Sequence, residues 1–258
     1  MRNQALTVRF IIGLVLAFTL SRSLLARTEE GQQIMIAGPS AYAVEIGKDI
    51  ARKGGNVIDV AVAVNLTLAV TAPYFGSLGG GGFALVKMGP KVEVLDFRET
   101  APQATNKKFY TERPKQASSD GGTAIGVPGI PAGLWELHKK YGKLHWSRLF
   151  YRPIQLATQG FEVSAEWAET TAAHRDRFNS GGKRAFFKRD GKNYLPGDTL
   201  KQPDLAKALK QMSVRGVQPF YRDEVARDIV ESVRKSGGVM TLQDLRNYKV
   251  RWLTPLYW

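Results

Sequence analysis

The sequence predicts a mixed α/β (α+β) domain, and three observations support this prediction. The chain has 258 residues, of which 43 % are hydrophobic, so it can enclose a real core. A run of four glycines precedes two short segments with strand patterning. Apolar residues at helical spacing dominate the remainder. Because no linker, repeat or low-complexity tract interrupts the chain after about residue 34, we expect one continuous domain there.

The first two predicted elements lie between residues 40 and 70. Ser40 can cap a helix that Gly54-Gly55 ends, and Asn56 with Asp59 can cap a second helix. Residues 57–70 leave two alternatives open. Their alternating valines favour a strand, whereas the absence of charge after Asp59 suits a fully buried helix.

A β-hairpin follows the glycine run at residues 79–82. Residues 83–88 and 91–97 are separated by Gly89-Pro90, and the second segment alternates apolar with charged residues. This alternation is typical of a half-exposed return strand.

The register of this hairpin places an arginine beside the glycines. A turn centred on Gly89-Pro90 pairs residues whose numbers sum to about 179, so Phe97 lies opposite Gly82 and Arg98 lies opposite Gly81. A guanidinium at a strand end can hold a carboxylate through two parallel hydrogen bonds. The alternative is an ordinary ion pair between Arg98 and a neighbouring acid, and residue chemistry alone leaves both open.

The rest of the chain predicts mostly helices. Their expected limits are Pro131 to Gly142, a helix through Ile154 that ends at Gly160, Ser164 to His174, Pro203 to about Gly216, and Val225 to Gly237, with a Thr241/Asp244 capping box on a last short turn.

Several site types are excluded or disfavoured. The chain has no cysteine, which removes disulfides, thiolate metal sites and a cysteine nucleophile. Its three histidines include no pair at i, i+4, so we expect no metal site. The glycine run loosely fits a dinucleotide fingerprint, but a strand follows it where that fingerprint needs a helix, so we expect no nucleotide cofactor.

Two other candidates are better explained by structure than by catalysis. His138 lies on an apolar helical stripe, which favours a packed, hydrogen-bonded histidine over a catalytic base. Thr170-Thr171 with His174 could suggest a threonine nucleophile. However, these residues have helical spacing and no strand or glycine context, so we interpret them as ordinary helix residues.

The formal net charge is +14, yet the lysines and arginines are scattered and form no five-residue basic block. This distribution favours a basic soluble surface over a nucleic-acid site.

The N-terminus predicts export. Residues 1–26 combine three arginines, no acids and an apolar run of residues 10–20, which is typical of a signal peptide and too short for a transmembrane helix. We expect cleavage between residues 23 and 27 and a periplasmic or secreted product. A retained membrane anchor is the alternative.

Several motifs together resemble the gamma-glutamyltranspeptidase family. They occur in family order from about residue 34 to the last residue. They are residues 54–59, 79–83, Asp96-Phe97-Arg98-Glu99-Thr100-Ala101-Pro102, residues 126–129, 133–138, 141–142, 220–222, and 237–248. The chain departs at Ile125, where the family often has serine, and at His145, where it usually has proline.

The resemblance implies a fold, an activity and a substrate. The fold is part of a four-layer αββα sandwich, as in N-terminal-nucleophile hydrolases. The activity is transfer or hydrolysis of gamma-glutamyl groups, as from glutathione, a small-molecule substrate. The arginine matching Arg98 holds the glutamyl α-carboxylate in such an enzyme, so Arg98 is the substrate-binding candidate.

In this family the precursor cuts itself into a large and a small subunit, and the nucleophile is the first threonine of the small subunit, with its own α-amine as base. Residues 27–258 therefore resemble an incomplete large-subunit domain that lacks the catalytic threonine and the small subunit. We expect this chain alone to be inactive. The alternatives are an acylase on other amides within the family and, outside it, a non-catalytic binding protein or a degenerate gene fragment.

Overall fold

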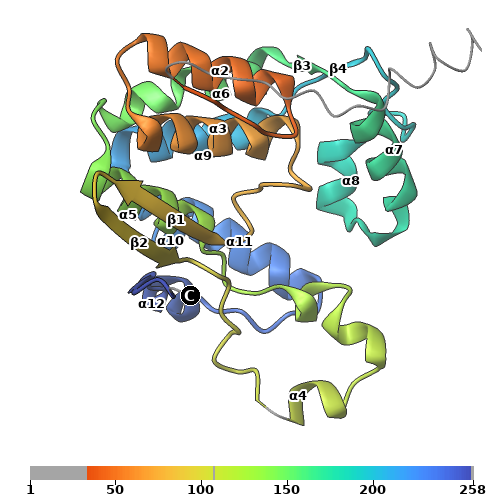
Figure 1. Ribbon diagram of the computed structural model, residues 1–258. Coiled ribbons are helices and arrows are strands. Elements are labelled where there is room, and N and C mark those ends of the chain that lie inside the picture. Colours follow the sequence, from red (N-terminus) through yellow and green to blue (C-terminus); the bar gives the residue numbers. More distant parts are fainter. Residues whose placement is uncertain (1–33, 107, 257–258) are drawn as a thin grey trace, which may run out of the picture. The chain divides into compact units, whose positions relative to one another are not determined.

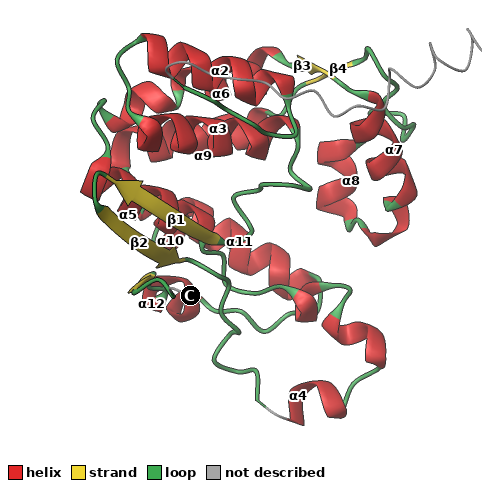
Figure 2. Cartoon of the chain, viewed as in Figure 1, coloured by secondary structure: helices red, strands yellow, loops and turns green. Residues whose placement is uncertain are grey.

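The computed structural model describes residues 34–106 and 108–256, so the predicted signal peptide lies outside the described residues. From Ile36 onwards the chain forms one compact unit. Helices dominate this unit, and the strands are few and short (Figures 1 and 2). The predicted mixed α+β class is therefore confirmed.

The first two elements are α2 (Ala41–Arg52) and α3 (Val57–Thr71), which pack against each other. Residues 57–70 are thus helical, and the strand alternative is wrong. Most of the residues of α3 are buried, so this helix can have apolar side chains on all of its faces. The alternating valines are therefore compatible with a helix and do not indicate a strand. Asn56 and Asp59 form the predicted capping box. Ser40, in contrast, makes no capping bond, because its hydroxyl pairs with that of Thr71 at 2.8 Å.

The predicted hairpin consists of β1 (Phe83–Met88) and β2 (Lys91–Asp96). Its antiparallel register pairs Phe83 with Asp96, and the ladder continues through two backbone hydrogen bonds between Gly82 and Phe97. This register confirms the prediction. A third strand, β5 (Arg251–Leu253), pairs with β2 and was not expected from the sequence.

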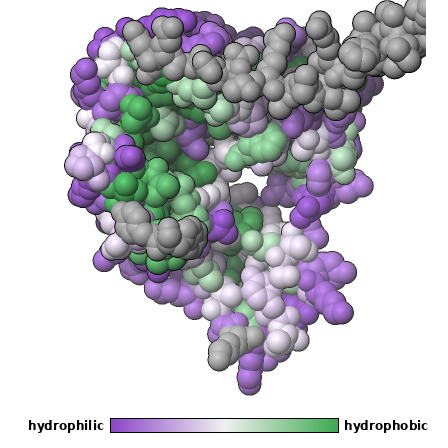
Figure 3. Space-filling view, in the orientation of Figure 1, coloured by the Kyte–Doolittle hydropathy of each residue, from purple (hydrophilic) through white to green (hydrophobic). Residues whose placement is uncertain are grey.

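The two faces of this three-stranded sheet differ. Val86 and Leu95 are buried on the face where α5 (Ile130–Tyr141) packs on β2 (Figure 1). On the opposite face Phe83, Leu85 and Leu253 are 62 %, 72 % and 42 % exposed. Hydrophobic surface is visible over the hairpin in Figure 3. We call Phe83, Leu85 and Leu253 the open sheet face.

The remaining elements include every other predicted helix. They are α4 (Lys108–Thr111), α6 (Tyr151–Gln159), α7 (Ala165–Ala173), α8 (Ser180–Phe186), α9 (Pro203–Arg215), α10 (Gln218–Tyr221), α11 (Glu224–Lys235) and α12 (Leu242–Asn247), with a two-stranded pair β3 (Phe161–Glu162) and β4 (Thr199–Leu200). The short elements α4, α8, α10, β3 and β4 were not predicted. Within the described residues no helix is both long and apolar enough to span a bilayer.

Candidate functional site

Arg98 lies two residues beyond the end of β2 and lines a cavity of about 330 Å³ together with Thr100, Ile125 and Gly126. Its side chain is 59 % exposed. The nearest carboxylate is that of Glu99, whose Oε2 lies 3.6 Å from the Arg98 Nε, a loose pair in contact with solvent. The guanidinium is therefore available to an anionic ligand entering the cavity.

The glycine run is a close-packing element beside Arg98. A Cβ on Gly81 would lie 2.6 Å from the Glu99 nitrogen and 2.7 Å from the Phe97 oxygen. The Gly80 carbonyl accepts the N–H groups of Gly129 and Ile130 at 2.8 and 3.0 Å, which ties the run to the start of α5. The predicted closeness of the glycines to the Arg98 backbone is confirmed.

The main chain of Arg98 is held from both sides. Its N–H donates to Asp96 Oδ1 at 2.9 Å, and its carbonyl accepts the Tyr248 hydroxyl at 2.8 Å. Asp96 is 5 % exposed and also pairs with Arg251 on β5. The Arg98 N–H and the Arg251 guanidinium together outweigh burial and hold the pKa of Asp96 below its usual value.

The residues after Arg98 are fixed as well. Thr100 and Val127 exchange two backbone hydrogen bonds at 3.3 and 2.8 Å. The N–H of Gln103 donates to Asp244 Oδ1 at 2.8 Å. Asp244 is buried, and its other carboxylate oxygen accepts the N–H and hydroxyl of Thr241 in the predicted capping box of α12.

Tyr248 is itself braced. Its ring stacks on that of Tyr221, with centroids 5.7 Å apart and planes 11° apart. Tyr221 is buried, and its hydroxyl donates to the Pro128 carbonyl and accepts the Ala132 N–H. Burial, followed by the nearby carboxylates of Asp96 and Glu99, raises the pKa of Tyr248 to about 12, so its hydroxyl stays protonated as a donor.

The roles of Asp96, Asp244 and Tyr248 in holding Arg98 were not predicted. Of these three residues, Tyr248 was indicated only as part of a motif of the resemblance. A capping-box signal marked Asp244, but nothing local in the sequence connects Tyr248 with a residue 150 positions away.

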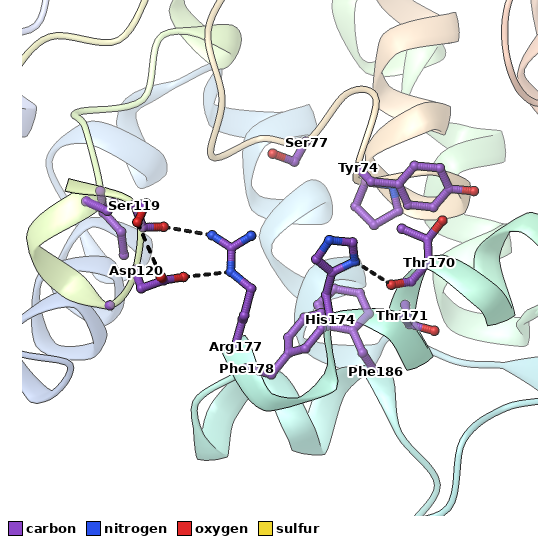
Figure 4. Close-up of a pocket in the computed structure, with 14 residues that line it drawn as sticks. Tyr74, Ser77, Ser119, Asp120, Thr170, Thr171, His174, Arg177, Phe178 and Phe186 are labelled. Atoms are coloured by element: carbon purple, nitrogen blue, oxygen red, sulfur yellow. Dashed lines mark hydrogen bonds and ion pairs between the residues drawn. The ribbon is translucent and has the colours of Figure 1, made fainter. Parts of the chain in front are cut away.

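A second cavity, of about 630 Å³, is lined by Thr170, Thr171 and His174 (Figure 4). The Thr171 side chain lies in α7, is 5 % exposed and donates to the Trp167 carbonyl at 2.9 Å. The His174 Nδ1 bonds to the Thr170 carbonyl at 2.9 Å rather than to a threonine hydroxyl. No nucleophile and base are thus brought together here.

Arg177 lines the same cavity and is hydrogen-bonded to two other residues that line it. Its Nε donates to Asp120 Oδ1 at 2.6 Å and its Nη2 to the Ser119 carbonyl at 2.7 Å (Figure 4).

His138 is a packed residue. Its Nε2 lies 2.8 Å from the Leu144 carbonyl, and its ring contacts Trp146 at a centroid distance of 5.1 Å. Asp59, which is fully buried, accepts the N–H groups of Lys143 and Leu144 at 3.1 Å. These contacts fix the loop after α5. Over residues 34–106 and 108–256 no group of three or more histidine or acidic side chains is arranged to hold a metal ion.

Comparison with known proteins agrees with these motifs. The profile of the family described as Gamma-glutamyltranspeptidase matches residues 43–258. The chain is 37 % identical over 249 residues to the glutathione hydrolase proenzyme of Pseudomonas aeruginosa. That match covers 95 % of this chain but 44 % of the proenzyme, so the chain spans less than half the length of this relative.

Two solved structures are similar in fold. The gamma-glutamyltranspeptidase of Helicobacter pylori superposes with a TM-score of 0.86 at 38 % identity, over 89 % of this chain and 68 % of that one. The Pseudomonas nitroreducens gamma-glutamyltranspeptidase complexed with L-DON gives 0.78 at 36 % identity, over 88 % and 68 %. The family match covers most of the chain and agrees with its ordered motifs, so this chain belongs to the gamma-glutamyltranspeptidase family.

Proposed function

We propose that this chain is the substrate-carboxylate-binding part of an enzyme that hydrolyses or transfers gamma-glutamyl groups from glutathione-type substrates. The observation that carries the proposal is Arg98, an exposed guanidinium on a fixed main chain that lines a cavity with Thr100 and Gly126. The α-carboxylate of a glutamyl group is a planar anion that an arginine can bind with two hydrogen bonds.

The charge of the chain supports an anionic ligand. The formal net charge is +14, or +11 without the three arginines of residues 1–26, and it attracts small anions in general. Among the described residues the ion pair of Arg98 is the loose one to Glu99. A ligand carboxylate can form shorter, better aligned bonds than the 3.6 Å contact that it would replace.

We propose that catalysis needs a threonine supplied by the small subunit. Attack on an amide requires a nucleophile with an adjacent base. The threonine–histidine group at residues 170–174 does not supply this pair, because the Thr171 hydroxyl donates to the Trp167 carbonyl within α7. The open sheet face of Phe83, Leu85 and Leu253 is the surface that we expect the small subunit to cover, since sheets of a sandwich bury one face against each other.

The binding role is tested by titrating L-glutamate into the purified chain in a calorimeter. We expect wild type to bind and Arg98→Lys to bind about tenfold more weakly, because lysine lacks the paired donors. Arg52→Lys is the matched control, since the Arg52 side chain is 68 % exposed against 59 % for Arg98 and its partner is Asp49. Equal affinities for all three proteins would contradict the role of Arg98.

The activity is tested with a gamma-glutamyl anilide that releases a chromophore. We expect no release above background by the chain alone, and release when the missing part of the large subunit and the family's small subunit are both supplied. Release by the chain alone that is abolished by Thr171→Ala would show that the threonine pair of α7 is a nucleophile after all.

We also propose that residues 1–26 are a signal peptide and that the mature protein is periplasmic or secreted, from the basic and apolar pattern of these residues. N-terminal sequencing of the exported protein should give a first residue between 24 and 27. A mature chain that still starts at Met1 would contradict the proposal.

A further inference from the structure

We propose that Tyr248 is a positioning residue that fixes the main chain of Arg98 so that its guanidinium is held ready for a carboxylate. The inference rests on the proposed function, since it assigns how the carboxylate site is kept in shape. Its basis is the 2.8 Å hydrogen bond from the Tyr248 hydroxyl to the Arg98 carbonyl.

The contrast between the main chain and the side chain of Arg98 points to positioning. The N–H and the carbonyl are both bonded, to Asp96 and to Tyr248, whereas the side chain is 59 % exposed. A bound carboxylate then has to order only the guanidinium, because the backbone is already fixed. Such preorganisation lowers the entropy cost of binding.

Tyr248 is placed rigidly enough to act in this way. Its ring stacks on Tyr221, whose hydroxyl is bonded to Pro128 and Ala132 at the start of α5. A Cβ on Gly129 would overlap both the Phe97 carbonyl and the Tyr248 hydroxyl. The close packing of Tyr248 against the main chain at residue 129 therefore requires glycine at that position.

The other end of the segment is anchored by the same part of the chain. Asp244, in the first turn of α12, accepts the Gln103 N–H, and Tyr248 directly follows α12. Residues 98–103 are therefore held at both ends by one short helix and its C-terminal neighbour.

The test compares Tyr248→Phe with wild type in the full chain. This change removes the hydroxyl and keeps the ring that stacks on Tyr221. The control is Tyr42→Phe, which removes a hydroxyl that accepts the Glu162 N–H at 3.2 Å elsewhere in the fold. Amide hydrogen exchange of residues 98–103 reports the positioning, and calorimetric titration with L-glutamate reports its consequence.

We expect Tyr248→Phe to speed exchange of the Arg98 and Thr100 amides by up to about tenfold, the effect of losing one hydrogen bond. Its affinity for L-glutamate should fall by about threefold to tenfold, and its melting temperature should stay close to that of Tyr42→Phe. Unchanged exchange at these amides overturns the proposal. Faster exchange with unchanged glutamate affinity also overturns it.

Arg98→Lys separates this inference from the proposed function. If neither wild type nor Arg98→Lys binds L-glutamate, the carboxylate-binding function fails. The exchange rates of Tyr248→Phe still decide whether the tyrosine fixes the Arg98 main chain.

Discussion

The glycine run offers a sharp test of how closely the Arg98 segment is packed. We predict that Gly81→Ala destabilises the protein and that Gly79→Ala does not. A Cβ at Gly81 would lie 2.6 Å from the Glu99 nitrogen and 2.7 Å from the Phe97 oxygen. Both are main-chain atoms, which cannot rotate away, so the segment next to Arg98 must shift. At Gly79 the nearest atom would be the Ser77 Oγ at 3.8 Å, an ordinary contact.

The size of the effect follows from the contacts. Neither glycine has a positive φ, so the difference is steric and not conformational. Forcing an extra methyl group into a packed site costs about 1–3 kcal/mol. For a domain of this size each kcal/mol lowers the melting temperature by about 2–4 °C, so Gly81→Ala should melt about 2–12 °C below wild type. Gly79→Ala should melt at or slightly above the wild-type temperature, because alanine restricts the unfolded chain.

The assay is thermal unfolding followed by circular dichroism at low protein concentration, with L-glutamate titration on the same samples. Gly81→Ala should also weaken glutamate binding, since the displaced atoms flank Arg98. A Gly81→Ala protein that melts and binds like Gly79→Ala would show that the hairpin and the Arg98 segment are not packed as described, and the reasoning would fail.

Three further predictions concern stability and association. Asp59→Ala should lower the free energy of unfolding by about 3 kcal/mol or more, because the N–H groups of Lys143 and Leu144 lose their acceptor; a urea midpoint within error of wild type would contradict this. Burial acts to raise the pKa of Asp244, but the hydrogen bonds to this carboxylate outweigh burial and lower the pKa. The ionised Asp244 should therefore stabilise the fold above the ordinary pKa of about 3.9, and this stabilisation should be lost as pH falls below that value. Unfolding measured from pH 6 to pH 3 should therefore show a smaller acid loss for Asp244→Asn than for wild type, and equal slopes would refute the assignment. Without a small subunit to cover the open sheet face, we expect the chain to self-associate through it, because exposed apolar patches favour association. Leu85→Lys should reduce this association in sedimentation velocity at an unchanged melting temperature, since the Leu85 side chain is 72 % exposed; undiminished association would mean that this face is not the contact surface.

The sequence by itself determined the local features of this protein. The β1–β2 register follows from the position of the turn at Gly89-Pro90, because the centre of a hairpin turn fixes which residues pair. The capping boxes at Asn56 and Thr241 could also be predicted from the sequence, because the two partners of each box are only three residues apart. The ordered motifs indicated the family, which the comparisons show.

Only the tertiary structure decided the features that depend on distant partners. Residues 57–70 have the composition of either a strand or a buried helix, and packing against α2 settled the choice. β5 is three residues long and is a strand because β2 presents a free edge to it. Tyr248 meets Arg98 across 150 positions, so its role became visible only when α12 was placed beside the end of β2. Local patterns specify elements, whereas a binding site is an arrangement of elements, and that arrangement is fixed by burial and by hydrogen bonds between remote segments.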